Sequence, residues 1–192
     1  MLNDDLRLSD NHRLDSIIKI AVCTGLLAIL SPISIDVGQS VPLTLQSMLV
    51  VFFPLVFGWL NGGFAVLLYL LIGGLGLPVF ANYSGGWELF TGTSGGFLIA
   101  FLIAANVVGF FAERNYRLPT MMALGLLVSG QLIILFIGTH WMLGITHEAA
   151  NWASTLNSFL PPLLIKSTAG VILFVILLRV ARRPASRTQG LS

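Results

Sequence analysis

Charged side chains are scarce in this chain. Only 9% of its 192 residues are Asp, Glu, Lys or Arg, whereas about a quarter of a soluble domain is charged. Cysteine is scarcer still, because the single Cys23 has no partner for a disulfide framework. In contrast, 56% of the residues are hydrophobic and the mean hydropathy is +0.90. The composition excludes a soluble globular domain and predicts an integral membrane protein of one domain.

Six apolar stretches are long enough to cross a bilayer as helices, at about 17 to 25 residues per span. They are residues 17–35, 43–60, 62–80, 95–112, 120–139 and 159–181. We expect the third span to be loosened at its far end by Gly73, Gly74, Gly76 and Pro78. The predicted fold is therefore an all-α transmembrane domain over residues 17–181, between tails at residues 1–16 and 182–192.

The ten Lys and Arg residues are unevenly placed along the spans. If both termini are cytoplasmic, nine of the ten lie in the tails, loops and span ends on the cytoplasmic side, where such residues gather in membrane proteins. The three loops on the outer side then contain no Lys or Arg. The N-terminal tail also lacks the short basic start of a signal peptide. The pattern predicts two cytoplasmic tails, the C-terminal one basic. A net charge of only +2 argues against a nucleic-acid partner.

Lys166 is the tenth cation, and it lies inside the apolar run of residues 159–181. An ammonium group near hydrocarbon depth is costly and by default functional, with an anionic partner close by. It therefore indicates a site for a small acidic ligand. Two structural alternatives are that Lys166 extends to the outer headgroups, or that it pairs with Glu88 or Glu148.

Three polar or glycine-rich segments interrupt the hydrophobic pattern on the outer side. They are VPLTLQ (residues 41–46), ANYSGGWELFTGTSGG (81–96) and FLPPLLIK (159–166). Lys166 follows Pro161 by five residues, about 7 to 8 Å along a helix. We expect the three segments to converge on one outward-facing pocket with apolar walls and a few fixed polar groups, as a small-molecule site requires.

These three blocks, in this order within six spans, resemble the BioY family, the biotin-specific substrate-binding (S) components of energy-coupling factor (ECF) transporters. The resemblance covers about residues 41–170. It implies an ECF S-component-like helical bundle in the cytoplasmic membrane of a bacterial cell. It also implies high-affinity biotin binding and uptake, with no enzymatic activity and no cofactor.

The resemblance also implies roles for particular residues. Lys166, which matches the lysine of the family's sixth-helix motif, would pair with the biotin carboxylate. The expected polar contacts are Thr44, Gln46, Asn82 and Ser84. Close backbone approach and ring walls are expected from Gly85, Gly86, Trp87, Tyr83 and Phe80. Gln46 by itself also fits an interhelical hydrogen bond, which we expect for Gln131 and Asn106.

One position departs from the family's pattern. The family's motif at the start of the sixth helix is similar to FLPGDxxK, whereas this chain has Pro162 and Leu163 in place of the glycine and the aspartate. An acidic contact to the ureido nitrogens is therefore missing here. Either Asn82, Glu88 or a backbone carbonyl supplies that acceptor, or the specificity is altered. The alternative function is an S component or facilitator for another small carboxylate.

Energy for uphill uptake would come from partners. The sequence has no GxxxxGK[ST] segment, so we do not expect ATP hydrolysis by this chain. The resemblance implies a separate transmembrane coupling protein and a pair of ATPases. Small residues at helical spacing in the first span, Ala21, Gly25 and Ala28, permit close helix approach and are the expected docking stripe. Membrane lipid covers the remaining surface.

A hypothesis from another class is an intramembrane serine protease. Residues 92–95 read GTSG, which resembles the nucleophile motif of the rhomboid family. Such an enzyme requires a histidine base on a neighbouring span. The histidines are His12, His140 and His147, and the sixth span has none. The scattered histidines and the lone cysteine also predict no metal site.

Overall fold

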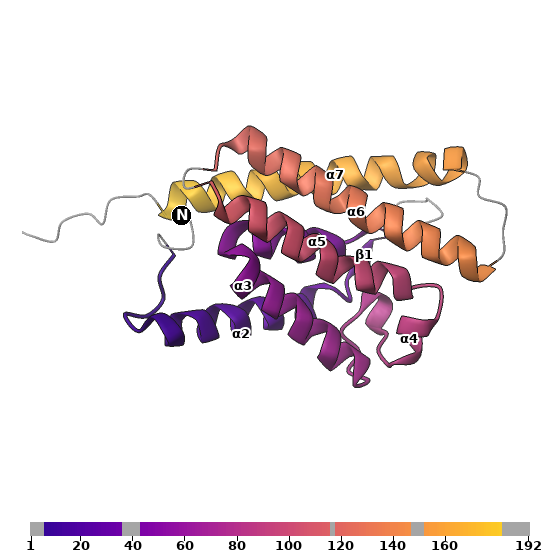
Figure 1. The fold of residues 1–192 in the computed structure, drawn as a ribbon, viewed down its shortest axis with the longest axis horizontal. Helices are drawn as coiled ribbons and strands as arrows, with labels where there is room; N and C mark the ends of the chain where they lie inside the picture. The colour runs from indigo at the N-terminus through magenta and orange to yellow at the C-terminus, as the bar shows by residue number, and fades with distance from the viewer. Residues whose placement is uncertain (1–5, 36–42, 116–117, 147–151, 182–192) are drawn as a thin grey trace, which may run out of the picture.

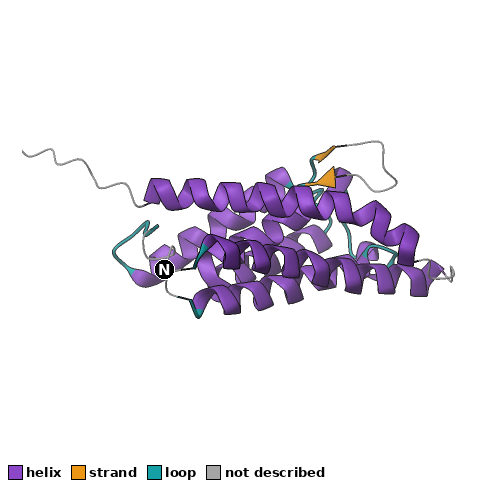
Figure 2. Ribbon diagram, turned by 90° about the horizontal axis from the view of Figure 1, so that it is seen from above, coloured by secondary structure: helices purple, strands orange, loops and turns teal. Residues whose placement is uncertain are grey.

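The computed structural model describes residues 6–35, 43–115, 118–146 and 152–181. Helices make up nearly all of this part of the chain (Figures 1 and 2). The elements are α2 (His12–Leu30), β1 (Ser34–Ile35), β2 (Leu43–Thr44), α3 (Gln46–Gly74), a 3₁₀ turn η1 (Ala81–Tyr83), α4 (Glu88–Thr91), α5 (Gly95–Glu113), α6 (Thr120–Thr146) and α7 (Trp152–Ala181). The predicted all-α fold is confirmed, apart from the two-residue strands.

Helix α2 begins at His12, ahead of the expected start at residue 17. Asn11 is the cause, because its side-chain oxygen accepts a hydrogen bond from the backbone N–H of Arg13 over 3.0 Å, which satisfies one of the free donors at a helix start. The helix ends at Leu30 rather than near residue 35. Pro32 follows closely, and proline has no backbone N–H with which to continue the helix.

Helix α3 contains both the second and the third expected spans. Gly58 breaks it with φ 82°, a left-handed conformation that glycine adopts without steric cost. The two halves, residues 46–57 and 59–74, then run antiparallel, because Gln46 bonds to Tyr69 and the Pro54 backbone lies where a Cβ of Gly62 would be. The second half ends at Gly74, so the predicted loosening of its far end is confirmed.

Helix α5 matches its expected span to within one residue, whereas α6 and α7 each match at one end and extend further at the other. Helix α6 runs to Thr146 rather than 139, and α7 begins at Trp152 rather than 159. Much of the expected third outer loop is therefore helical. With α2 and the two halves of α3, these helices make six passes through the bundle (Figure 1).

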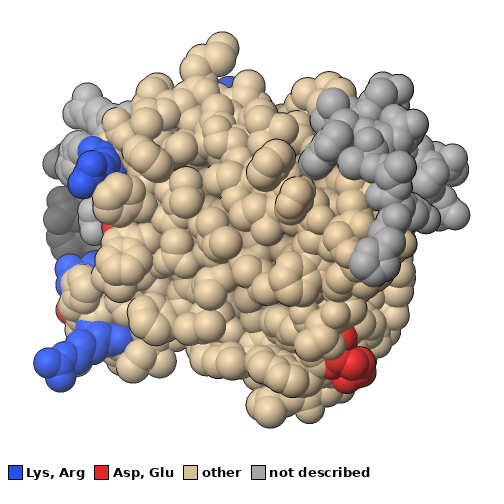
Figure 3. Space-filling view, turned by 45° about the vertical axis from the view of Figure 1, so that its right-hand side comes forward, with Lys and Arg blue, Asp and Glu red and all other residues tan. Residues whose placement is uncertain are grey.

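Helix α3 occupies the centre of the bundle. It packs against α5 on one side and α2 on another, while α5 packs against α6 and α6 against α7. Long apolar side chains remain on the outside, where they suit hydrocarbon. Four helical segments are long and apolar enough to span a membrane, namely α3, α5, α6 and residues 158–181 of α7. The face in Figure 3 carries most of its Lys and Arg side chains along one side and has neither across its broad middle. The chain is a membrane protein.

Candidate functional site

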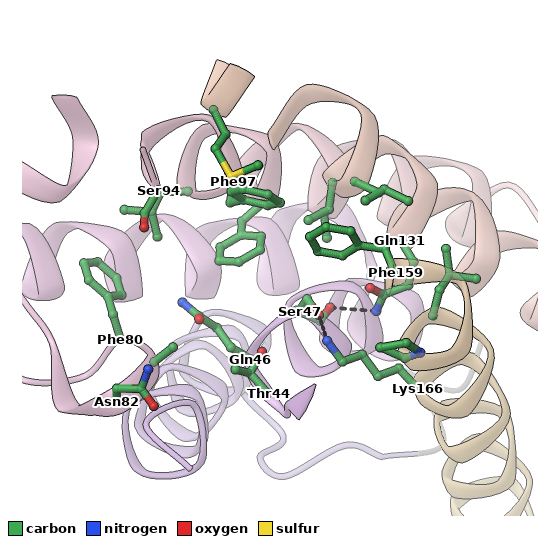
Figure 4. A pocket seen from close by; sticks show the side chains of 18 of the residues that line it. Thr44, Gln46, Ser47, Phe80, Asn82, Ser94, Phe97, Gln131, Phe159 and Lys166 are labelled. Atoms are coloured by element: carbon green, nitrogen blue, oxygen red, sulfur yellow. Dashed lines mark hydrogen bonds between the residues drawn. The ribbon is translucent and has the colours of Figure 1, made fainter. Parts of the chain in front are cut away.

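A pocket of about 490 Å³ lies at the end of the bundle where the strands and α4 also lie. Its size falls within the 300 to 1,000 Å³ of typical small-molecule sites. The start of α3, the loop around η1, the start of α5, the second half of α6 and the first half of α7 meet around it (Figure 4). Side chains from segments far apart in the sequence therefore face one cavity, as predicted.

Lys166 lies at one side of this pocket, and its Nζ donates a hydrogen bond to the Ser47 hydroxyl over 2.9 Å. Gln131 on α6 donates to the Ser47 backbone carbonyl over 3.1 Å, so three helices are joined here (Figure 4). Lys166 is the only charged residue among the described residues that line the pocket. The lining thus carries one positive charge and favours an anionic ligand.

The polar residues on the other side of the pocket are held by short strand and turn contacts. Thr44 pairs with Ser34 in the antiparallel β1–β2 ladder, which places it at the pocket just before α3. The Ser34 hydroxyl donates to Asn82 Oδ1 over 2.6 Å. Asn82 has φ 57°, a left-handed conformation that Asn tolerates better than most residues. Ser84 donates from its hydroxyl to the Ala81 carbonyl over 2.8 Å.

Aromatic rings form much of the apolar wall. Phe97 on α5 and Phe159 on α7 stack with their ring centroids 6.3 Å apart, and both line the pocket together with Phe80 and Phe101. Phe80 is also packed edge-on against Tyr69, with centroids 5.4 Å apart. Such walls suit the fused rings and aliphatic chain of a compact apolar ligand.

Of the ten predicted ligand contacts, six line the pocket: Lys166, Thr44, Gln46, Phe80, Asn82 and Ser84. The other four are not among the lining residues. Tyr83 is 70% exposed and Trp87 is 62% exposed, with the Trp87 ring 4.7 Å from that of Phe90. The roles of these ten residues as ligand contacts stay predictions.

The two glycines in this group serve the local fold. The Leu77 carbonyl lies where a Cβ of Gly85 would be, so a side chain there would collide with backbone. Gly86 has φ 118° and donates its N–H to the Gly73 carbonyl over 2.8 Å. Their contact with ligand also stays a prediction.

Sequence reasoning missed several lining residues. Ser47 directly follows the VPLTLQ block, and its polarity at a helix start was a usable signal. Gln131 was expected only as an interhelical bond, which it makes, but it also lines the pocket. Asn106, expected to bond between helices, instead donates to Leu102 of its own helix over 2.7 Å. Phe97 and Phe101 gave no signal, because pocket and core phenylalanines look alike in a sequence.

The two positions that depart from the family's motif both face this pocket. Pro162 and Leu163 are lining residues, and Leu163 is only 6% exposed. The wall one helical turn from Lys166 is therefore apolar where the motif has an acid. Within the described residues, the hydrogen-bond acceptor for Lys166 is the Ser47 hydroxyl rather than Glu88. Glu148 lies outside the described residues.

The serine protease hypothesis requires a histidine near Ser94. Ser94 lines the pocket, but the described histidines, His12 and His140, do not, and His140 stacks on Phe136 with centroids 6.3 Å apart. His147 lies outside the described residues.

The expected docking stripe lies on α2. In α2, Ala21 is exposed, and nothing lies within 4 Å of a Cβ built on Gly25. Ala28, the third residue of the expected stripe, is partly buried and packs against the core. The part of α2 around Ala21 and Gly25 is open to close approach.

Comparisons with known proteins agree with each other. The model of the BioY family matches residues 5–187. The chain is 33% identical over 166 residues to the biotin transporter BioY2 of Lactococcus lactis subsp. cremoris. This match covers 86% of this chain and 89% of that protein. It is 39% identical over 122 residues to the biotin transporter BioY of Thermotoga maritima, covering 64% and 70%.

A solved structure is also similar. It is the crystal structure of the S-component for biotin from an ECF-type ABC transporter. The two chains superpose with a TM-score of 0.77 at 25% sequence identity, and the match covers 92% of this chain and 96% of the other. The helical arrangement of the six passes is thus shared.

Proposed function

The chain belongs to the BioY family, and from this premise we propose that it binds biotin with high affinity as the S component of an ECF-type transporter. The observation that carries the proposal is Lys166, a single cation in a pocket of about 490 Å³ with apolar walls. Biotin has one carboxylate, a ureido edge and an apolar body. Membership in a family of transport components sets aside the serine protease hypothesis.

In this proposal, the biotin carboxylate bonds to Lys166, and the ureido edge lies toward Gln46, Asn82 and Ser84. Figure 4 supports this direction, because Lys166 and Asn82 lie toward opposite sides of the pocket with Gln46 between them. A charge-assisted hydrogen bond is stronger than a neutral one. The carboxylate would therefore contribute much of the affinity, and the neutral amides and hydroxyls would select the heterocycle.

We place the pocket at the outer face of the cytoplasmic membrane, with residues 1–16 and 182–192 as cytoplasmic tails. The distribution of cations supports this orientation. The start of α2, with Arg13, and the end of α7, with Arg179, lie at the opposite end of the bundle from α4, with Glu88 (Figure 1). Helix α4 also contributes Leu89 to the pocket. Lys and Arg stay on the cytoplasmic side in most membrane proteins.

The proposed energy source is a transmembrane coupling protein with a pair of ATPases. The open face of α2 around Gly25 supports it as the docking surface, because small residues permit close helix contact. Gly25→Leu would fill this space. We expect this variant to bind biotin as the native protein does but to lose uptake in cells that have the energising module. Retained uptake would remove this face from the docking surface.

The direct test is a calorimetric titration of the detergent-purified protein with biotin and with biotin methyl ester. We expect one-site binding of biotin that weakens by about 1.5 to 3 kcal/mol in Lys166→Ala, the range for hydrogen bonds to charged groups. The ester should bind the native protein and the variant equally. Arg179→Ala, which removes a cation from the last turn of the same helix, is the matched control. Equal losses for acid and ester would contradict the pairing.

A second candidate ligand is another small carboxylate, and Leu163 favours it. An apolar side chain that is 6% exposed in the pocket wall offers no acceptor to a ureido N–H. In this case the native protein would not bind biotin, but another monocarboxylate would raise its melting temperature, since a ligand stabilises the state that binds it. Lys166→Ala would abolish that stabilisation.

A further inference from the structure

Tyr69 lies directly behind the pocket wall without lining the pocket. It belongs to the second half of α3 and its side chain is completely buried. Its hydroxyl makes hydrogen bonds with Gln46 Nε2 at 2.8 Å and with the Val79 backbone carbonyl at 3.0 Å. One of these partners, Gln46, lines the pocket. The phenol therefore joins the start of α3 to the segment that leads into the η1 loop.

The donors and acceptors allow one arrangement of these three groups. A carbonyl oxygen only accepts, and a phenol has one proton, so the Tyr69 proton goes to Val79. The phenol oxygen must then accept from Gln46, and only the NH₂ end of the Gln46 amide can donate. The opposite orientation would place the Gln46 carbonyl oxygen against a phenol oxygen with no proton left to give. Tyr69 thus fixes which end of the amide faces it.

We propose that Tyr69 is a positioning residue that holds the Gln46 amide in one orientation, with its carbonyl oxygen Oε1 presented to the pocket as an acceptor for a ligand N–H, a role that rests on the proposed function. Gln46 is 5% exposed, so its amide has little water to replace a lost partner. An amide released from Tyr69 would present its NH₂ end to the ligand as readily as its oxygen.

The lack of an acid in the pocket makes this acceptor important. No Asp or Glu is among the described lining residues, and Leu163 gives no acceptor at its position. Asn82 Oδ1 already accepts from the Ser34 hydroxyl over 2.6 Å. A ureido group has two N–H donors that need acceptors when they leave water, because a buried unpaired donor is costly. The Gln46 oxygen can satisfy one of them.

Tyr69 also steadies a second part of the wall. Its ring meets the Phe80 ring edge-on, with centroids 5.4 Å apart, and Phe80 lines the pocket. Tyr69→Phe keeps this ring contact and removes only the hydroxyl. The variant therefore separates the orientation of Gln46 from the packing of the wall, and a retained melting temperature and gel-filtration profile would show that the fold is intact.

The experiment is a double-mutant cycle of biotin affinity with Tyr69→Phe, Gln46→Leu and both together, since such a cycle isolates coupling between two residues. We expect Tyr69→Phe to weaken biotin binding by about tenfold, the order of one hydrogen bond. In the Gln46→Leu background, Tyr69→Phe should cause no further loss. When Tyr69→Phe is combined with Lys166→Ala, whose contact lies elsewhere in the pocket, the two losses of affinity should add in full.

Native-like binding by Tyr69→Phe, or a loss that adds fully to that of Gln46→Leu, would overturn the proposal. If the native protein binds no biotin, the proposed function fails. The contact between Tyr69 and Gln46 is then tested without ligand, by the melting temperatures of the native protein, the two single variants and the double variant. Changes in melting temperature that do not add would show that Tyr69 and Gln46 are coupled. Changes that add in full would show that the two residues act independently.

Discussion

Lys166 on α7 and Ser47 on α3 are 119 positions apart in the sequence, yet the Lys166 ammonium donates to the Ser47 hydroxyl over 2.9 Å. An ammonium group has three N–H donors, so this bond uses one and leaves two for a ligand carboxylate. Gln131 in turn bonds to the Ser47 carbonyl over 3.1 Å. Ser47 therefore fixes where the charge lies before any ligand arrives, which lowers the ordering cost of binding.

The first prediction concerns Ser47→Ala. Without the hydroxyl, the long Lys166 side chain has more rotamers to lose on binding. We expect biotin affinity to fall by up to about tenfold, which corresponds to a net hydrogen bond of about 0.5 to 1.5 kcal/mol. Calorimetric titration measures the change. Native affinity would show that the ligand carboxylate orders Lys166 without help.

Ser167→Ala is the matched control for Ser47→Ala. Ser167 is the next residue after Lys166, it is 1% exposed, and its hydroxyl has no hydrogen-bond partner within the described residues. Removing a buried hydroxyl that makes no bond costs little or is stabilising. We therefore expect unchanged biotin affinity and an unchanged or higher melting temperature.

The second prediction concerns Leu163→Asp, which puts a carboxylate into the wall of the pocket. We expect biotin to bind more weakly, because the new carboxylate lies one helical turn from Lys166 and would repel the biotin carboxylate that this lysine holds. We also expect the ligand-free protein to melt at a lower temperature, since a buried carboxylate is costly unless it is well paired. Biotin should restore part of that loss. Tighter binding in titration would mean that this wall meets the ureido edge, and the proposed direction of the ligand would be reversed.

The site could be predicted where one chemical signal stood out from its surroundings. A lone cation inside an apolar run marked Lys166, and polar residues before a span marked Thr44 and Gln46. The walls gave no such signal. Phe97 lines the pocket, whereas other phenylalanines fill the core or face outward, and hydrophobicity is the same in each place. Burial and direction are set by packing, so only the fold separates these roles.

The fold was predicted in its class and in the number of passes, but less well at the turns. The expected break between the second and third spans is a single residue, Gly58, inside one helical element. Hydropathy does not register such a reversal, because the residues on both sides are equally apolar. Similarly, α6 and α7 extend past the expected loop boundaries, since polar residues near a membrane surface are compatible with helix.

Lys19 is a charged residue whose burial could not be predicted from the sequence. In the sequence it lies at the edge of the first span and counts as one more cytoplasmic cation. In the structure it is 2% exposed and paired with Asp15. The cause is the segment before α2, which folds back so that the Leu8 N–H donates to Asp15 Oδ1 over 2.6 Å. Nothing in the residue pattern predicts the hydrogen bond between Leu8 and Asp15.

The third prediction concerns the close approach within α3. The backbone of Pro54 lies where a Cβ of Gly62 would be, so Gly62→Ala forces the two halves of α3 apart. We expect a loss of about 1 to 3 kcal/mol in stability, the usual cost of overpacking. Gly125→Ala is the control, because nothing lies within 4 Å of its Cβ position and alanine favours helix over glycine by about 1 kcal/mol. Melting temperatures in detergent should therefore change in opposite directions.

The fourth prediction concerns the buried ion pair of α2. Lys19 Nζ lies 2.7 Å from Asp15 Oδ2, and the two side chains are 1% and 9% exposed. Lys19→Met leaves the Asp15 carboxylate buried without its counter-ion, and removing one partner of a buried pair costs about 3 to 5 kcal/mol. The double variant Asp15→Asn/Lys19→Met has no uncompensated charge. We therefore expect the single variant to melt well below the native protein and the double variant to recover most of the difference.

The same variants also test the assignment of binding to Lys166. The Asp15–Lys19 pair lies in the first half of α2, which begins at the opposite end of the bundle from α4 (Figure 1), and no described residue of α2 lines the pocket. Removing this cation should lower stability without changing biotin affinity, the opposite of the pattern expected for Lys166→Ala. Titration and melting of both lysine variants under one condition give the comparison. A matching loss of affinity in Lys19→Met would mean that any buried charge supports the pocket through the fold, and Lys166 would then no longer be singled out as the ligand contact.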